Sequence, residues 1–313
     1  MSESSLTRAA VVGTGHLGTF HAEKYAAIES CELVGVVDVD LDRAKALADR
    51  LSCKAYSKPD DLIGQVDCVS VAVPTTLHRS VAGQLLEAGV DCLVEKPLAA
   101  SGVEADELVA LAHAHDCILQ VGHLERFNPA LIRLAGMIRK PRFVECHRLA
   151  PFTPRGADVD VVRDLMIHDL DLIALLQPAE IVHIDSVGIP VLTPNVDLAN
   201  VRLSFADRCV ANVTASRVSG KRERKLRLFQ EDLYLAIDLG ERKAQVAHRH
   251  SNPNDALEID WEELDLGEGD ALEAQVRAFI ASVQTRARAA TTGEDGSRAL
   301  HLCERILTSM ETE

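Results

Sequence analysis

Three residues of this chain have the types and spacing that could move a proton to and from an alcohol. Asp164 and His168 are four residues apart in a stretch with helical periodicity, so their side chains are expected on one helix face. A carboxylate beside an imidazole orients the ring and raises its basicity, which suits a general base. Lys96 ends an apolar run and precedes Pro97, which biases its backbone to an extended conformation. A lysine held in this way can stabilise an alcohol oxygen as it becomes a carbonyl oxygen.

Each of these residues also has a simpler interpretation. Lysine is usually a surface residue, and a His–Asp pair on a helix is often only a solvated pair. Asp169 and Asp171 could pair with neighbouring side chains, and a metal site built on His168 and the aspartates lacks a motif for a further ligand. We therefore expect no metal, and the proton-transfer hypothesis depends on the motif that accompanies these residues.

That motif is a glycine-rich turn directly after the apolar run 9–12. It reads Gly13-Thr14-Gly15-His16-Leu17-Gly18. In such a turn the first glycine allows the tight bend, the second lets the backbone approach a pyrophosphate, and the third lets the helix pack on the strand. The following strand-like run ends at Asp38, whose carboxylate can bind adenosine ribose hydroxyls and repels a 2′-phosphate. The sequence therefore predicts an NAD site, with NAD favoured over NADP.

Further cofactor contacts are expected where neighbouring strands end, because the carboxyl ends of parallel strands meet at one edge of a sheet. Pro74, Thr75 and His78 follow one such run, and Glu95 and Lys96 follow another. A threonine at this place equally fits a helix N-cap.

The elements that position these residues form two patterns, as expected for two domains in 313 residues. In the first pattern continuous apolar runs alternate with helical runs, which is typical of a doubly wound parallel sheet in an α/β fold. Its strands are expected near 9–13, 32–38, 54–56, 68–73, 91–95 and 118–122, and its helices near 17–28, 41–51, 60–63, 77–88 and 102–115. The second pattern predicts helices near 129–138, 161–176, 272–287 and 296–310, and extended segments near 142–148, 181–191, 196–205, 209–218, 224–230, 234–238 and 243–248.

These patterns indicate a cofactor-binding domain over 1–122 and an α+β domain with an open, mostly antiparallel sheet over 123–313. The last helices could pack back on the first domain. The net charge of −15 argues against a nucleic-acid or anionic-membrane partner. The N-terminus lacks the apolar segment of a targeting signal, and the eight cysteines form no CxxC pair, so we expect a cytoplasmic protein.

In these motifs and their order the chain resembles the Gfo/Idh/MocA family of NAD(P)-dependent sugar oxidoreductases over essentially its whole length. The resemblance implies a Rossmann first domain and a second domain that binds substrate and forms a homodimer or homotetramer. It also implies that Lys96, Asp164 and His168 are catalytic. Met166 departs from the family, in which many members carry glycine between the aspartate and the histidine.

A narrower resemblance is carried by residues 122–130 and 166–173. These segments are similar to the UDP-N-acetylglucosamine 3-dehydrogenase subgroup, which makes a 3-keto nucleotide sugar for a partner aminotransferase in lipid A precursor synthesis. Glu125, Arg126 and Asn128 could then bind sugar or phosphate, or equally cap a helix and form salt bridges. A diphosphate also needs cations, and the candidates are Arg126, Arg148, Arg155 and Arg163.

Two alternatives remain. One is another sugar or cyclitol dehydrogenase, acting on a UDP-sugar acid or on inositol. The other is a non-catalytic NAD-dependent sensor, against which the joint presence of Lys96, Asp164 and His168 speaks.

Overall fold

The computed structural model describes residues 6–153, 159–251 and 257–310. The chain divides into two compact units. The first comprises the chain up to Leu124 together with Asp270–Leu300, and the second comprises Glu125–Gly269 and the residues from His301. Helix α7 (Ala271–Thr285) and the start of α8 (Gly293–Met310) belong to the first unit.

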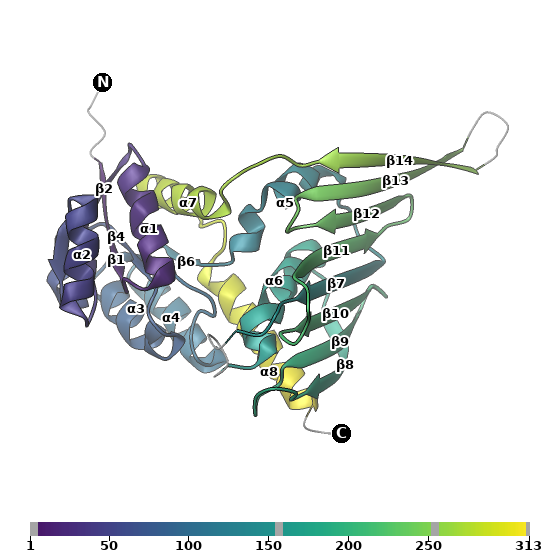
Figure 1. The fold of residues 1–313 in the computed structure, drawn as a ribbon, viewed down its shortest axis with the longest axis horizontal. Helices are drawn as coiled ribbons and strands as arrows, with labels where there is room; N and C mark the ends of the chain where they lie inside the picture. The colour runs from purple at the N-terminus through teal and green to yellow at the C-terminus, as the bar shows by residue number, and fades with distance from the viewer. Residues whose placement is uncertain (1–5, 154–158, 252–256, 311–313) are drawn as a thin grey trace. The chain divides into compact units, whose positions relative to one another are not determined.

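The first unit is built on a six-stranded parallel sheet with the order β3-β2-β1-β4-β5-β6 (Figure 1). Its strands are β1 (Thr7–Val12), β2 (Cys31–Val37), β3 (Lys54–Tyr56), β4 (Cys68–Val71), β5 (Asp91–Val94) and β6 (Leu119–Val121). Its further helices are α1 (His16–Ala27), α2 (Leu41–Leu51), α3 (His78–Glu87) and α4 (Gly102–Ala114). The strand order reverses between β1 and β4, which is where such sheets bind ligands.

Apolar side chains cover both faces of this sheet. Ala10 and Val12 of β1 belong to one buried cluster, which also contains Leu300 of α8. Ala9 and Val11 belong to the other, which contains Phe279 of α7. Burial on both faces explains why the strands are continuously apolar in the sequence.

The second unit contains an eight-stranded sheet with the order β14-β13-β12-β11-β7-β10-β9-β8. Its strands are β7 (Phe143–Leu149), β8 (Ile181–Ile189), β9 (Leu198–Phe205), β10 (Val210–Ser216), β11 (Glu223–Phe229), β12 (Leu233–Asp238), β13 (Lys243–Ser251) and β14 (Leu257–Asp265). Strands β7 and β10 are parallel, and the other neighbouring strands of this sheet are antiparallel over the described residues. The predicted fold class, a Rossmann sheet followed by an α+β domain with a mostly antiparallel sheet, is confirmed.

Helices lie on one face of the second sheet. Figure 1 shows α5 (Pro129–Leu134), α6 (Ile167–Leu176) and the C-terminal end of α8 on the same side of the strands. In β7, Val144, Cys146 and Arg148 are buried on this side, and Arg148 contacts α6. The alternate residues of β7 are half-buried on the opposite face.

One strand and two details of the helices differ from the sequence-based expectations. Strand β14 was not expected, because its segment carries five acidic residues among its nine positions. A helix is present over 161–176 as expected, but its first part, Val162–Met166, is a π-helical turn that precedes α6. The last helix, expected from residue 296, begins three residues earlier, at Gly293 of α8.

Among the described residues, none of the helices combines the length and apolar character needed to cross a membrane.

Candidate cofactor and active site

The glycine turn joins β1 to α1, and its backbone passes close to its neighbours. Gly13 has a positive φ of 96°, and a Cβ there would lie 2.5 Å from the carbonyl oxygen of Ala72. A Cβ on Gly18 would overlap the carbonyl oxygen of Gly13. Both glycines are therefore required by the fold of the turn.

Gly15 faces open space and fits a different requirement. It is the N-cap of α1, no side chain caps this helix, and a Cβ on Gly15 would meet nothing within 4 Å. The N–H groups of the first helical turn are thus open to an anion, as a dinucleotide pyrophosphate requires. His16 and Leu17 are exposed on this turn, and the ring of His16 packs edge-on against Phe20.

Asp38 at the end of β2 is buried and fixed by hydrogen bonds. Its Oδ2 accepts from the main-chain N (2.8 Å) and the hydroxyl (2.7 Å) of Thr14, and Oδ1 accepts from Asp40 N (2.9 Å). Burial alone would raise the pKa of Asp38, but these bonds and the Arg43 guanidinium outweigh it, so the pKa is lowered. A carboxylate has about four positions at which it can accept a hydrogen bond. The contacts with Thr14 and Asp40 use three of them, so one position on Oδ1 could accept from a ribose hydroxyl.

Strand β5 leads into Glu95 and Lys96, which are half-buried. The Lys96–Pro97 peptide bond is cis. Oε1 of Glu95 lies 2.9 Å from Nε2 of His21 on α1. The two motifs predicted to bind cofactor are thus connected by a side-chain contact inside the first unit.

The residues after β4 differ in exposure. Pro74 is exposed and Thr75 is half-buried, and neither caps a helix through its side chain. His78 is buried, with Nδ1 2.9 Å from the carbonyl oxygen of Pro97 and Nε2 3.0 Å from that of Val73. In this arrangement the His78 ring connects the segment after β4 to the segment that follows Lys96.

In the second unit, the π-helical turn and α6 position the predicted acid–base pair. Asp164 lies in the turn and His168 is the second residue of α6, and both are half-buried. Met166, at the end of the turn, is completely buried. Single π-helical turns are frequent at functional sites, and the sequence carried no signal for this one beyond the unusual Met166.

A buried ionic cluster surrounds α6. Arg148 of β7 donates to both oxygens of Asp169 (2.8 Å each) and to Oε1 of Glu125 (2.9 Å). Arg126 donates to both oxygens of Asp171, at 2.8 and 2.6 Å. Each bidentate pair joins α6 to another part of the unit.

These contacts bear on the predicted substrate groups. Glu125 and Arg126 are ion-paired, and Asn128 caps α5 while its amide donates to Glu125 and to the carbonyl oxygen of Leu239. The capping and salt-bridging interpretation therefore describes their contacts in this structure. Burial opposes the charge of Glu125, but Arg148 and the hydrogen bond from Asn128 lower its pKa.

The remaining arginine candidates are Arg163 and Arg155. Arg163 donates from Nη1 to Asp160 at 2.8 Å, and its Nε has no hydrogen-bond partner within the described part of the chain. Arg155 lies outside the described residues. Among the residues described, no group of three or more His, Cys, Asp or Glu side chains could hold a metal ion.

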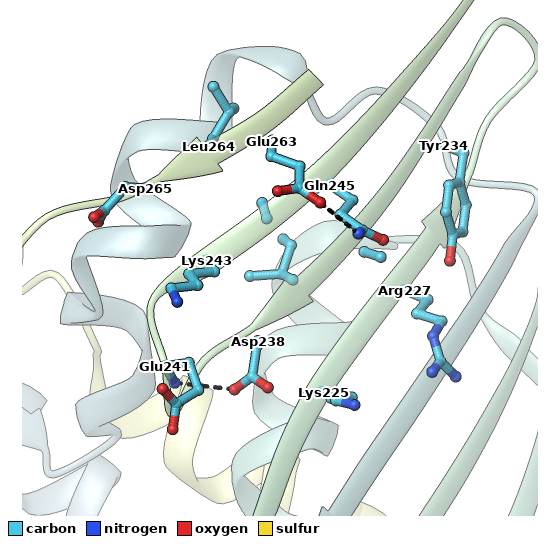
Figure 2. Close-up of a pocket in the computed structure, with 13 residues that line it drawn as sticks. Lys225, Arg227, Tyr234, Asp238, Glu241, Lys243, Gln245, Glu263, Leu264 and Asp265 are labelled. Atoms are coloured by element: carbon cyan, nitrogen blue, oxygen red, sulfur yellow. Dashed lines mark hydrogen bonds between the residues drawn. The ribbon is translucent and has the colours of Figure 1, made fainter. Parts of the chain in front are cut away.

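A hollow of about 590 Å³ lies on the helix-free face of the second sheet (Figure 2). Figure 2 shows the cationic side chains Lys225 and Arg227 of β11 and Lys243 of β13, together with Asp238 of β12, which lies between these strands, and Glu263 of β14. None of the predicted site residues lines it. The hollow is lined by both cationic and anionic side chains. Such a lining suits contact with another protein surface better than binding of an anionic ligand.

Comparisons with known proteins agree with this cofactor site. The profile of the Gfo/Idh/MocA oxidoreductase family, which describes an NAD-binding Rossmann fold, matches residues 7–123. UDP-N-acetylglucosamine 3-dehydrogenase from Acidithiobacillus ferrooxidans is 38% identical over 307 residues, 97% of each chain. The solved structure of that enzyme superposes with a TM-score of 0.91, covering 97% of this chain and 98% of that one. Myo-inositol 2-dehydrogenase from Thermotoga maritima is 26% identical over 338 residues, covering 97% of this chain and 96% of the relative.

The matching family profile and a relative that is 38% identical over nearly the whole length lead to one conclusion. The chain belongs to the Gfo/Idh/MocA family and is an NAD-dependent oxidoreductase of this sugar dehydrogenase family.

Proposed function

We propose that this protein oxidises a ring hydroxyl of a nucleotide sugar, namely the C3 hydroxyl of UDP-N-acetylglucosamine, to a ketone. The observation that supports this substrate is the 38% identity to a UDP-N-acetylglucosamine 3-dehydrogenase, which extends through the second unit as well as the first. Identity confined to the cofactor-binding unit would support only a dehydrogenase of undefined substrate. We expect an aminotransferase to consume the ketone.

In this proposal the cofactor lies along the glycine turn. The N–H groups at the start of α1 bind its pyrophosphate, and the remaining acceptor position of Asp38 takes one ribose hydroxyl. Pro74, Thr75 and Glu95 lie at the ends of β4 and β5, where the nicotinamide end would be held. Bound NAD supplies the hydride acceptor of the reaction.

The protein residues handle the proton and the oxygen. His168, oriented by Asp164, removes the proton from the substrate hydroxyl. Lys96 donates a hydrogen bond to the same oxygen and stabilises it as the carbonyl forms. Arg163 keeps donors beyond its pair with Asp160 and is the described arginine that we assign to the substrate diphosphate.

We also propose that a second copy of the chain covers the helix-free face of the second sheet. Phe143, Phe229, Tyr234 and Trp261 form a row across this face, with neighbouring ring centroids 4.8 to 6.2 Å apart. Trp261 is 64% exposed. An exposed aromatic row beside charges of both signs suits a self-complementary contact.

The substrate is tested by mass spectrometry of a sugar panel incubated with the protein, NAD and a carbonyl-trapping reagent. The trap is needed because oxidation of a secondary alcohol by NAD is uphill and little ketone accumulates. A keto adduct of UDP-N-acetylglucosamine, located at C3 by fragmentation, is the expected result. An adduct on myo-inositol but not on the UDP-sugar would instead favour the activity named for the Thermotoga relative.

A further inference from the structure

A continuous chain of hydrogen bonds inside the first unit ends at Glu95, the residue that precedes Lys96. Tyr25 Oη lies 2.8 Å from Ser70 Oγ, Ser70 Oγ lies 3.0 Å from His21 Nδ1, and His21 Nε2 lies 2.9 Å from Glu95 Oε1. Tyr25, His21 and Ser70 have no exposed surface. Burying polar groups this completely destabilises the fold unless their hydrogen bonds are made. These hydrogen bonds are therefore needed for the three side chains to lie in the core.

The chemistry of the groups determines the direction of the chain. A carboxylate oxygen only accepts, so Nε2 of His21 must carry the hydrogen that faces Glu95. In the neutral ring, Nδ1 then accepts from Ser70, and Ser70 accepts from Tyr25. Burial raises the pKa of Tyr25, so this phenol keeps its proton and donates. With the His21 ring neutral, every donor in the chain points toward Glu95.

The Glu95 carboxylate is also confined by the backbone. A Cβ built on Gly122 would lie 2.9 Å from each carboxylate oxygen, so a larger residue there would displace the carboxylate from this position. The main-chain N–H of Glu95 donates a hydrogen bond to the carbonyl oxygen of Val71, and the main-chain N–H of Gly122 donates one to the carbonyl oxygen of Val94. The carboxylate thus has a defined place, beside the residue that we assign as catalytic.

We propose that His21 is a positioning residue for Lys96, because it fixes the Glu95 carboxylate whose negative charge orients the neighbouring ammonium group. This inference rests on the proposed function, in which Lys96 stabilises the substrate oxygen. His21 lies on α1, whose N-terminus is the proposed pyrophosphate site. One helix would therefore position both the cofactor and, through Glu95, the lysine.

The groups that act on Glu95 determine the expected pH dependence. They are His21, which donates to it, and the charges of Lys96 and His78. Burial opposes ionisation of Glu95, but these groups outweigh it and lower its pKa. Without the donor of His21, burial would dominate, and the carboxyl would take up a proton at a higher pH.

The test compares His21→Asn with His21→Gln in the full-length enzyme saturated with NAD. The amide nitrogen of glutamine reaches the position of Nε2, whereas that of asparagine corresponds to Nδ1 and falls short of Glu95. We expect the ratio of the kcat/KM of His21→Asn to that of the wild type to fall as the pH is lowered and to recover at high pH, where Glu95 is ionised again. Taking this ratio cancels the ionisation of His168, the proposed base, which both enzymes share. His21→Gln should retain the wild-type profile, and the NAD dissociation constant should change little in both variants.

His113 offers a matched control, since it forms an exposed pair with Glu294 at 2.7 Å in the same unit. His113→Asn should leave the profile unchanged. The probes are UDP-N-acetylglucosamine and myo-inositol, with NADH formation measured across the pH range. A ratio that stays at the wild-type value across the pH range in folded His21→Asn would overturn the proposal.

Two further experiments keep the proposal decidable if His21→Asn does not fold or if neither probe reacts. Glu95→Gln removes the titrating carboxyl and should lower kcat at least tenfold at saturating NAD. Wild-type kcat in this variant would contradict the inference. Long-range ¹H–¹⁵N spectra of the NAD-bound enzyme with labelled histidine should show a hydrogen on Nε2 of His21 that Glu95→Gln perturbs, and a hydrogen on Nδ1 alone would refute the chain.

Failure of the proposed function would have a different signature. Lys96→Ala with wild-type turnover would remove the catalytic assignment of the lysine itself. Loss of turnover in Lys96→Ala together with an unaltered His21→Asn profile would leave the proposed function in place and reject only the role of His21.

Discussion

Lys96 carries the most direct test of the chemistry at the level of single residues. Replacing it by methionine keeps the length of the side chain and removes the ammonium group. Because proton handling and charge stabilisation by one side chain contribute about 10²- to 10⁴-fold to rate, we expect kcat to fall by that range while NAD affinity is retained. Single-turnover measurement of NADH formation, with NAD binding by calorimetry, checks both expectations. Lys45→Met, at an exposed lysine on α2, is the control, and loss of NAD binding in Lys96→Met would contradict the assigned role.

Asp38 carries the test of cofactor choice. Asp38→Ser removes the carboxylate that repels a 2′-phosphate. It also removes one of the two carboxylates near the guanidinium of Arg43, which lies 3.8 Å from Oδ2 of Asp38 and 3.4 Å from Oδ2 of Asp40. We expect the preference for NAD over NADP, as a ratio of kcat/KM values, to fall by about ten- to a hundredfold, equivalent to about 1.4–2.8 kcal/mol. Thr14→Val removes one hydrogen bond to the carboxylate but keeps its charge, so this control should retain the preference. An unchanged ratio in Asp38→Ser would show that another group selects the cofactor.

The residues that sequence reasoning could identify were those in short-range motifs. Asp38, Glu95 and Lys96 each follow a strand-like run, so their position at the sheet edge was predictable. His21 and Ser70 could not be found in this way, and Arg148 was named only as a candidate for a diphosphate. The partners of these residues are 21 to 74 residues away, and only the fold brings them together.

At the level of elements, the ionic cluster around α6 determines how firmly the helix carrying His168 is held. Arg148→Met leaves the carboxylates of Glu125 and Asp169 buried without their cation. Removing one partner of a buried pair costs about 3–5 kcal/mol, so we expect that loss in the free energy of unfolding. Trp261 is the only tryptophan and lies in the second unit, so its fluorescence in urea reports this transition.

Arg224 provides the comparison for that measurement. Its side chain is 43% exposed and approaches Glu125 only to 3.7 Å, so Arg224→Met should cost less than about 1 kcal/mol. Equal losses in the two variants would show that the buried cluster does not hold α6 in the way described.

His78 connects two loops and predicts a pH dependence of stability. Burial lowers the pKa of His78 below its usual 6.5, despite hydrogen bonds to the carbonyl oxygens of Pro97 and Val73 and the charge of Glu95. A histidine with a lowered folded-state pKa stabilises the fold fully above about pH 6.5 and loses that contribution as the pH falls through its folded-state pKa. His78→Gln should therefore have a shallower decrease in melting temperature between about pH 7 and pH 5 than the wild type. Scanning calorimetry in that range checks it, and parallel curves would exclude His78 as the source.

Most elements were predictable because their periodicity was strong, and the exceptions have physical reasons. The Rossmann strands are continuously apolar, and strands β8 to β13 alternate or carry β-branched residues, so both sets were found within a few residues. Strand β14 pairs with β13 over nine residues, but its five acidic side chains give its sequence little strand character, so it was not predicted. The π-helical turn depends on backbone hydrogen bonding that side-chain spacing does not reveal.

For the whole molecule, the remaining question is what covers the helix-free face of the second sheet. Its aromatic row joins four strands and includes Trp261, and the hollow beside it is lined by charges of both signs. A monomer with a net charge of −15 would gain nothing from exposing such a row to solvent. The arrangement therefore favours association with a second copy, in which cationic side chains of one copy meet acidic ones of the other.

Phe229→Glu tests this association, because it places a carboxylate in the middle of the aromatic row on an interior strand. Light scattering after gel filtration should give a dimer or tetramer for the wild type and a species near the 34.0 kDa chain mass for the variant, with the same circular dichroism. Leu175→Glu introduces the same charge at a 52% exposed leucine on α6, on the helix-covered side, and should leave the assembly intact. A wild-type protein that is monomeric at micromolar concentration, or a Phe229→Glu variant that still assembles, would place the contact between copies elsewhere or exclude it.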